Sequence, residues 1–134
     1  QIISSISPNL GVYATEPEAD PVQEWLMSCE AFLPFSNDKQ LVLPGHKLPF
    51  YGLPHRLKQL IENHHSALKR LVAFLKEPQT AVDCFPVLFN RKISDNEYGL
   101  ALVEAVAHLN HLYRKKIVKR ELNSKGAYVY TLKN

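Results

Sequence analysis

The feature that most constrains the fold is a long amphipathic segment from Pro54 to Lys76, followed by Pro78. Proline lacks a backbone N–H and its ring clashes with the preceding turn, so Pro78 ends the segment. No apolar run approaches the roughly 20 residues that a membrane-spanning helix needs. Mostly apolar residues recur in this segment at steps of three and four, the spacing that places side chains on one face of a helix. They are Leu57, Leu60, Ile61, His64, Leu68, Leu71, Val72 and Leu75.

Shorter elements precede this segment. Residues 1–19 show no sustained period and predict loop. Asp20 and Pro21 predict a helix that extends to about Phe32, because an acidic side chain caps a helix and proline suits its first position. Residues 40–43 predict a short buried strand.

Two further helices and a hairpin follow. Thr80 predicts the cap of a short helix through Cys84, and Ser94 begins a capping box for a helix over 97–114. Residues 118–132 alternate between apolar and polar around a turn, which predicts a β-hairpin. Three helices and a terminal hairpin are typical of a winged helix-turn-helix, and the chain as a whole is expected to be α+β.

Charge divides the chain into two parts. Residues 1–52 hold six acidic and two basic side chains, a formal charge of −4, whereas residues 53–134 hold seven acidic and 14 basic ones, a charge of +7. This break predicts two units of different origin. The basic half could attract a phosphate backbone, or it could be an ordinary solvated surface.

One short motif is similar to a known family. Leu41-Val42-Leu43-Pro44-Gly45-His46 is followed by Pro49, the long helix and the three-helix-plus-hairpin order. Over residues 21–132 the chain resembles the C-terminal part of metallo-β-lactamase-fold hydrolases. The branch it is most similar to carries an appended winged-helix domain and includes glyoxalase-II-like and endoribonuclease-like proteins.

The resemblance implies a metal role for one residue. His46 would be the last protein ligand of a binuclear site, usually zinc, and no residue of the chain is expected to be catalytic. The other ligands of the family come from an upstream HxHxDH stretch that this chain lacks. One imidazole cannot hold a catalytic zinc ion, so the chain alone is expected to be inactive and to be a piece of a longer hydrolase. Lys47 stands where the family commonly has glycine, so this loop could run differently.

The same resemblance predicts two domains and their partners. Residues 1–52 would be the C-terminal remnant of the catalytic domain, and residues 53–134 a winged-helix-like appendage that shapes the substrate cleft. The partners would be the rest of that catalytic domain and a substrate, either a small-molecule ester or thioester or RNA, with no membrane. Cys29 and Cys84 form no disulfide framework, which is typical of a reducing compartment and predicts a cytoplasmic protein.

Other histidines and cysteines have simpler interpretations. His64 lies in the apolar stripe and is expected to be a core or interface residue with its ring nitrogens hydrogen-bonded. Its neighbour His65 points about 100° away. His108 and His111 could share a helix face, but no further ligand lies near them in the sequence. Cys84 is expected in the core, as is Trp25.

The alternative function is a winged-helix module that binds nucleic acid or a protein partner without catalysis. Sequence-specific DNA readout is disfavoured, because the first turns of the third helix carry no Arg, Asn or Gln to read base edges. Backbone contacts to RNA or single strands stay open through the later basic residues. The outer face of that helix is expected to carry Glu97, Ala101, Glu104, His108 and His111.

Overall fold

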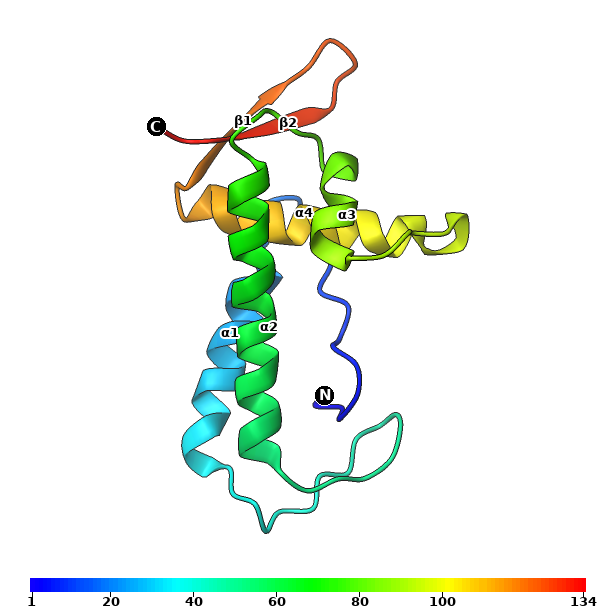
Figure 1. The fold of residues 1–134 in the computed structure, drawn as a ribbon, viewed down its shortest axis with the longest axis vertical. Coiled ribbons are helices and arrows are strands. Elements are labelled where there is room, and N and C mark those ends of the chain that lie inside the picture. Colours follow the sequence, from blue (N-terminus) through cyan, green and yellow to red (C-terminus); the bar gives the residue numbers. More distant parts are fainter.

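A computed structural model describes residues 1–134. It contains four α-helices and one antiparallel sheet of two strands, which confirms the α+β class (Figure 1). None of the helices combines the length and the hydropathy of a membrane span. The elements are α1 (Pro21–Phe32), α2 (Leu53–Phe74), α3 (Phe85–Phe89), α4 (Tyr98–Arg114), β1 (Val118–Leu122) and β2 (Tyr128–Leu132), with single 3-10 turns at Leu33–Phe35, Val82–Cys84 and Asp95–Glu97.

Local signals set the starts of α1 and α4 as predicted. The Asp20 carboxylate accepts the N–H of Gln23 at 3.0 Å and so caps α1. Ser94 and Glu97 form the expected capping box ahead of α4. Helix α2 begins one residue earlier than predicted and ends two residues earlier, at Phe74. The short helix predicted from Thr80 through Cys84 is instead a single 3-10 turn over Val82–Cys84. Helix α3 follows it, with Pro86 in its first turn, where proline is tolerated.

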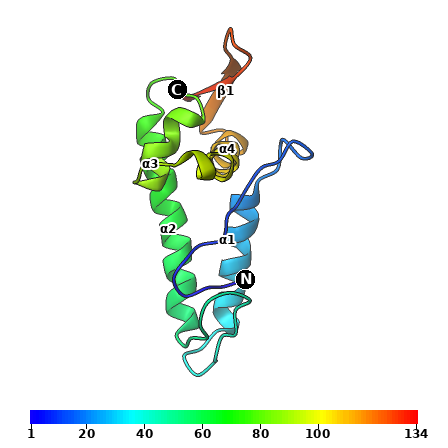
Figure 2. The same ribbon diagram turned by 90° about the vertical axis from the view of Figure 1, so that its right-hand side faces the viewer.

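The helices make two layers. Helices α1 and α2 lie side by side and run in opposite directions, while α4 crosses the upper half of α2 at a steep angle (Figures 1 and 2). Helix α1 contacts both of them, and α3 packs against α2 and α4. The hairpin and the C-terminus lie at the end of the molecule that holds α4 (Figure 1). The 33–52 loop lies at the opposite end.

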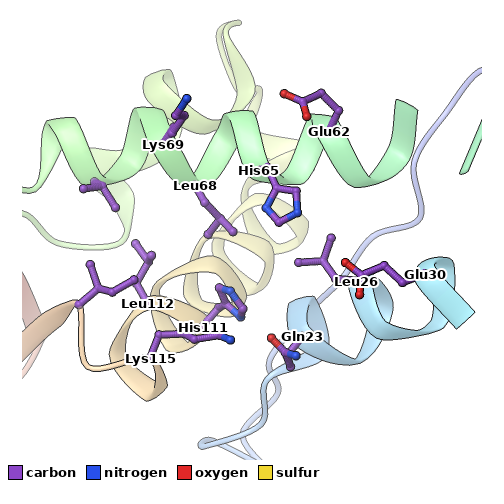
Figure 3. A pocket seen from close by; sticks show the side chains of 12 residues that line it. Gln23, Leu26, Glu30, Glu62, His65, Leu68, Lys69, His111, Leu112 and Lys115 are labelled. Carbon is purple, nitrogen blue, oxygen red and sulfur yellow. The ribbon is translucent and has the colours of Figure 1, made fainter. Parts of the chain in front are cut away.

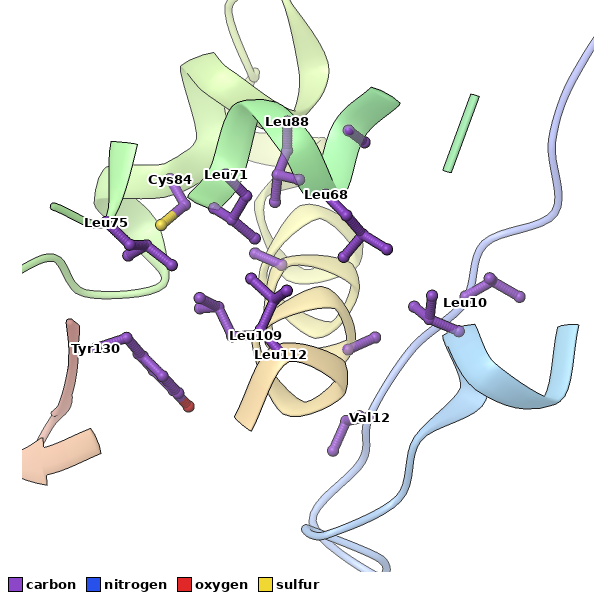
Figure 4. Packing of buried hydrophobic residues seen from close by; sticks show 14 of the residues in the cluster. Leu10, Val12, Leu68, Leu71, Leu75, Cys84, Leu88, Leu109, Leu112 and Tyr130 are labelled. Carbon is purple, nitrogen blue, oxygen red and sulfur yellow. The ribbon is translucent and has the colours of Figure 1, made fainter. Parts of the chain in front are cut away.

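The hydrophobic core lies where α4 crosses α2 (Figure 4). Leu71 and Leu109 are completely buried there, and Cys84 is too, as expected. The N-terminal segment joins the core through Leu10 and Val12, and the Val12 N–H donates to the Val103 carbonyl at 3.1 Å. Both halves of the chain therefore contribute to one core, while the proposed boundary after residue 52 stays a prediction.

Both strands hold the hairpin on the core, through Val118 of β1 and Tyr130 of β2. Val118 pairs with Leu132 and Arg120 with Tyr130 in the antiparallel register. Tyr130 is buried, and its backbone forms a two-way bridge with Gln79 at 2.8 and 3.0 Å. The alternation of residues 118–132 thus predicted this element correctly, including its turn.

Two predictions about exposure were wrong. Residues 40–43 are not a buried strand: Val42 alone forms an isolated bridge with Phe50, and Leu43 is 73% exposed. The expected outer face of α4 is largely buried, with Ala101, His108 and His111 each at 6% exposure or less. The cause is the loop before α1, which lies over this face together with α2.

Candidate functional site

The Pro-Gly-His motif lies at the tip of a closed loop. The Val42 N–H donates to the Phe50 carbonyl at 2.8 Å, and the reverse bond measures 3.1 Å. This bridge draws the two ends of the loop together and presents Gly45 and His46 at its exposed tip. A histidine held outward on a closed loop is placed to contact a group outside this chain.

His46 is bound by the side chain of Gln1. The Gly45 N–H donates to Gln1 Oε1 at 2.6 Å, which fixes the orientation of the amide, and Gln1 Nε2 lies 2.6 Å from His46 Nδ1. Because the amide nitrogen can only donate, Nδ1 accepts. A neutral His46 therefore carries its proton on Nε2, and that nitrogen cannot ligate a metal until the proton moves.

Lys47 adopts the backbone conformation that glycine favours. Its φ angle is +67°, in the left-handed region. A lysine at this position therefore does not prevent the left-handed turn that a glycine would make after the histidine.

The chain alone does not fit a metal centre. No group of three or more His, Cys, Asp or Glu side chains lies close enough together to hold an ion. His46 has no second ligand from this chain beside it, and its Nε2 keeps a proton while the Gln1 amide donates to Nδ1. Any metal at His46 would need its other ligands from elsewhere.

His64 is buried, as predicted, and it contacts a second histidine, but it is not fully hydrogen-bonded, because its Nε2 has no partner. Its Nδ1 lies 3.3 Å from His108 Nε2, and the rings stack with centroids 5.5 Å apart. His108 Nδ1 lies 2.9 Å from the Glu104 carbonyl and must donate to it. His108 Nε2 then accepts from His64, and His64 Nε2 is left unprotonated with no donor from the chain.

Burial controls the titration of this cluster. It lowers the pKa of His64 to about 4, with the neighbouring His108 adding to the effect. Burial also lowers the pKa of His108. On the same face of α4, burial raises the pKa of Glu104 to about 7, opposed by a hydrogen bond from Asn9. At neutral pH both imidazoles are therefore uncharged.

His65 and His111 line a cavity of about 690 Å³ between α1, α2 and α4 (Figure 3). His111 Nδ1 lies 3.1 Å from the Asp20 carboxylate, and both side chains are nearly buried. His108 and His111 thus have different partners and do not form a metal pair. No pattern in the sequence indicated the contact with Asp20, which is 91 residues away.

Basic side chains gather beside the hairpin around a groove of about 600 Å³. Its charged members are Arg114, Lys116, Lys119, Arg120 and Lys133. Arg120 lies between two aromatic rings, 4.1 Å from the centroid of Tyr113 and 4.5 Å from that of Tyr128, and pairs with Glu18 at 2.6 Å. The lysines and Arg114 are exposed.

The comparisons with known proteins agree with the fold. Residues 68–133 match the family described as metallo-beta-lactamase-like, C-terminal domain. These residues form a metallo-beta-lactamase-like C-terminal domain. They include the upper end of α2, helices α3 and α4 and the hairpin.

Solved structures extend this likeness over the rest of the chain. A beta-lactamase domain protein from Burkholderia ambifaria is 31% identical over 98% of the chain, with a TM-score of 0.93. A metallo-beta-lactamase family protein from Thermus thermophilus is 26% identical over 98% of the chain, with a TM-score of 0.79. No curated relative matches. The chain spans 39% and 40% of the length of these two proteins, so it corresponds to less than half of each.

Proposed function

We propose that the chain is the C-terminal part of a metal-dependent hydrolase of the metallo-beta-lactamase superfamily, with zinc as the metal. The observation that carries this proposal is the likeness to the Burkholderia protein, which includes the metallo-beta-lactamase-like C-terminal domain and the His46 loop before it. The activity belongs to the longer protein, and this chain by itself is inactive.

His46 is the ligand that the chain contributes. It lies on an exposed, closed loop, and a neutral imidazole is a good zinc ligand. Bound zinc would lower the pKa of a water molecule and so supply a hydroxide nucleophile. Release of the Gln1 amide from Nδ1 lets the proton transfer to that atom and frees Nε2 for the metal.

The partner is the rest of the catalytic domain. Large apolar side chains are exposed on α1 and on the loop after it. This loop lies at the end of the molecule opposite the hairpin (Figure 1). Surfaces of this kind mark interaction sites, because soluble proteins rarely leave contiguous apolar patches uncovered. They belong to Met27, Phe32, Phe35, Leu41, Leu43, Leu48 and Tyr51, which are 49–79% exposed.

The later helices and the hairpin serve the substrate cleft. We infer that residues 53–134 are a winged-helix-like appendage that narrows the entrance to the metal centre and selects a small ester or thioester, or RNA. The burial of α4 argues against its use as a recognition helix in a DNA groove, because its residues 101–112 are buried or half-buried. Two free, buried cysteines support a cytoplasmic location.

The test is His46→Ala in the intact protein, with His55→Ala as the matched control. His55 is exposed at the start of α2, so its removal leaves the metal loop alone. We expect His46→Ala to lose bound zinc and thioester or RNA hydrolysis, and His55→Ala to keep both. Full metal content and activity in His46→Ala would refute the role of this residue.

The basic groove favours a second candidate function, a nucleic-acid-binding module without catalysis. Exposed Lys116, Lys119 and Lys133 suit contacts to a phosphate backbone. We expect Lys116→Glu with Lys119→Glu to abolish salt-dependent binding of random RNA. The control pair Lys39→Glu with Lys58→Glu makes the same charge change away from the groove, and equal loss there would refute a localised site.

A further inference from the structure

The cavity of about 690 Å³ between α1, α2 and α4 carries opposite charges at its two ends (Figure 3). Glu30 and Glu62 lie at one end, on the right of this view. Lys69 and Lys115 lie at the other end, and His65 lies between the two. Along α2, Lys69 follows Glu62 by seven residues, which corresponds to about 10 Å of helix. The two ends therefore suit the two charges of one dipolar molecule.

The charged groups at both ends have no partner within the chain. Every ion pair of the chain joins other residues. The two glutamates and the two lysines are also exposed. A ligand with complementary charges therefore gains each interaction without breaking an existing one, and the arrangement of the charges fixes its direction in the cavity.

The wall between the two ends is apolar. Leu26, Leu68 and Leu112 line it, and all three belong to the hydrophobic core. None of them is more than 8% exposed. Because the core already holds these side chains in place, a ligand that packs on them does not have to order them first. The wall favours a ligand with apolar side chains.

His111 adds a polar group whose orientation is fixed. Its Nδ1 donates to the Asp20 carboxylate at 3.1 Å, and its ring lines the cavity. The chain gives His111 Nε2 no hydrogen-bond partner, yet this atom, unlike His64 Nε2, is not closed off from solvent. In the neutral ring Nε2 is therefore an accessible acceptor, which suits a ligand that carries N–H groups.

We propose that this cavity binds a short apolar peptide with a free ammonium group and a free carboxylate. The ammonium group lies at the glutamate end, the carboxylate at the lysine end, and the side chains pack on the leucines. An extended peptide rises about 3.3 Å per residue, so three residues span the separation of about 10 Å. Its backbone N–H groups supply the donor for His111 Nε2. The site is separate from the proposed metal centre, because none of its lining residues belongs to the His46 loop.

The probe is the tripeptide Leu-Ala-Leu, titrated into the intact protein by isothermal titration calorimetry. Its N-acetyl derivative lacks the ammonium group, and its C-terminal amide lacks the carboxylate. We expect saturable binding of the free tripeptide, and binding about fivefold weaker for each derivative, the effect of one partly exposed charge pair. No saturable binding, or equal affinities for the three peptides, would overturn the proposal.

Two variants with matched controls locate the ends of the peptide. Lys115→Gln should weaken binding of the free tripeptide about fivefold and leave binding of its amide unchanged. The control is Lys116→Gln, an adjacent exposed lysine that does not line the cavity. Glu30→Gln should weaken binding of the free tripeptide to the same extent and leave that of the N-acetyl derivative unchanged, with the exposed Glu24→Gln on the same helix as its control. Equal losses in a variant and its control would refute the site.

Discussion

His108 donates its Nδ1–H to the backbone carbonyl of Glu104, one turn earlier on α4, at 2.9 Å. The two side chains lie on the same face of α4, and burial favours the neutral form of each. Because His108 is a base and Glu104 is an acid, burial of the two makes the free energy of unfolding depend on pH in opposite directions. His64, on α2, adds to the base side of this balance.

The first prediction follows from Glu104. Its pKa is raised from 4.5 to about 7, so between these values the folded chain holds a proton that the unfolded chain has lost, and stability falls as pH rises through this window. The pKa of His64 is lowered from 6.5 to about 4, so there stability falls as pH falls. We expect the two effects largely to offset each other in the natural chain.

Glu104→Gln removes one side of this balance. The amide does not titrate and still accepts from Asn9, so the variant should be more stable than the natural chain above pH 7. Between pH 6.5 and 4 it should lose about 3 kcal/mol as pH falls, because the unfolded chain binds a proton at His64 that the folded chain does not bind above its pKa of about 4. Urea unfolding at a series of pH values measures both effects. The exposed Glu62→Gln is the control, and a flat profile for Glu104→Gln would contradict the assignment.

The second prediction separates two roles of Asp20. It caps α1 by accepting the Gln23 N–H, and it pairs with the nearly buried His111. Asp20→Ser keeps a capping oxygen and loses the charged partner, whereas Asp20→Ala loses both. We expect Asp20→Ala to be less stable than Asp20→Ser by about 1 kcal/mol, the usual contribution of a cap. Equal denaturant midpoints for the two variants would mean that the cap contributes nothing.

Elements with local signals could be predicted from the sequence, and their surroundings could not. Asp20 and Pro21 mark the start of α1 within a short stretch of chain, and the turn around Gly126 marks the hairpin. The burial of His108 and His111 depends on residues 9–20 and on α2, which are 44 to more than 90 residues away in the chain. No periodicity within α4 carries that information.

The candidate sites divide in the same way. The motif around His46 singled out one residue and its loop, because proline, glycine and histidine in a row have a local meaning. The cavity between α1, α2 and α4 is lined by side chains from all three helices. The prediction that α4 has an exposed face gave no indication of this cavity. Residues 40–43 have the pattern of a short buried strand, an apolar run after a turn, yet they have only one bridge partner, Phe50.

The third prediction concerns backbone conformation. Lys47 has a φ of +67°, which strains a residue with a Cβ atom, whereas Gly52 has a φ of +89° without strain. We expect Lys47→Gly to raise the free energy of unfolding by about 0.5 kcal/mol and Gly52→Ala to lower it by about 1 kcal/mol. A Cβ at position 52 would meet no atom within 4 Å, so any loss there reports conformation and not a clash. Thermal unfolding of both variants measures whether Lys47→Gly raises stability and Gly52→Ala lowers it.

The last prediction concerns Gln1 and rests on the proposed metal role of His46. The Gln1 amide donates to His46 Nδ1 and thereby keeps the proton on Nε2, the nitrogen that a metal would need. Gln1→Leu keeps the approximate size of the side chain and removes the donor. In the intact protein we expect this variant to bind zinc several-fold more tightly, because one hydrogen bond no longer has to break. Competition against a chelator measures the affinity. Weaker zinc binding in Gln1→Leu would show that Gln1 instead orients the imidazole toward the metal.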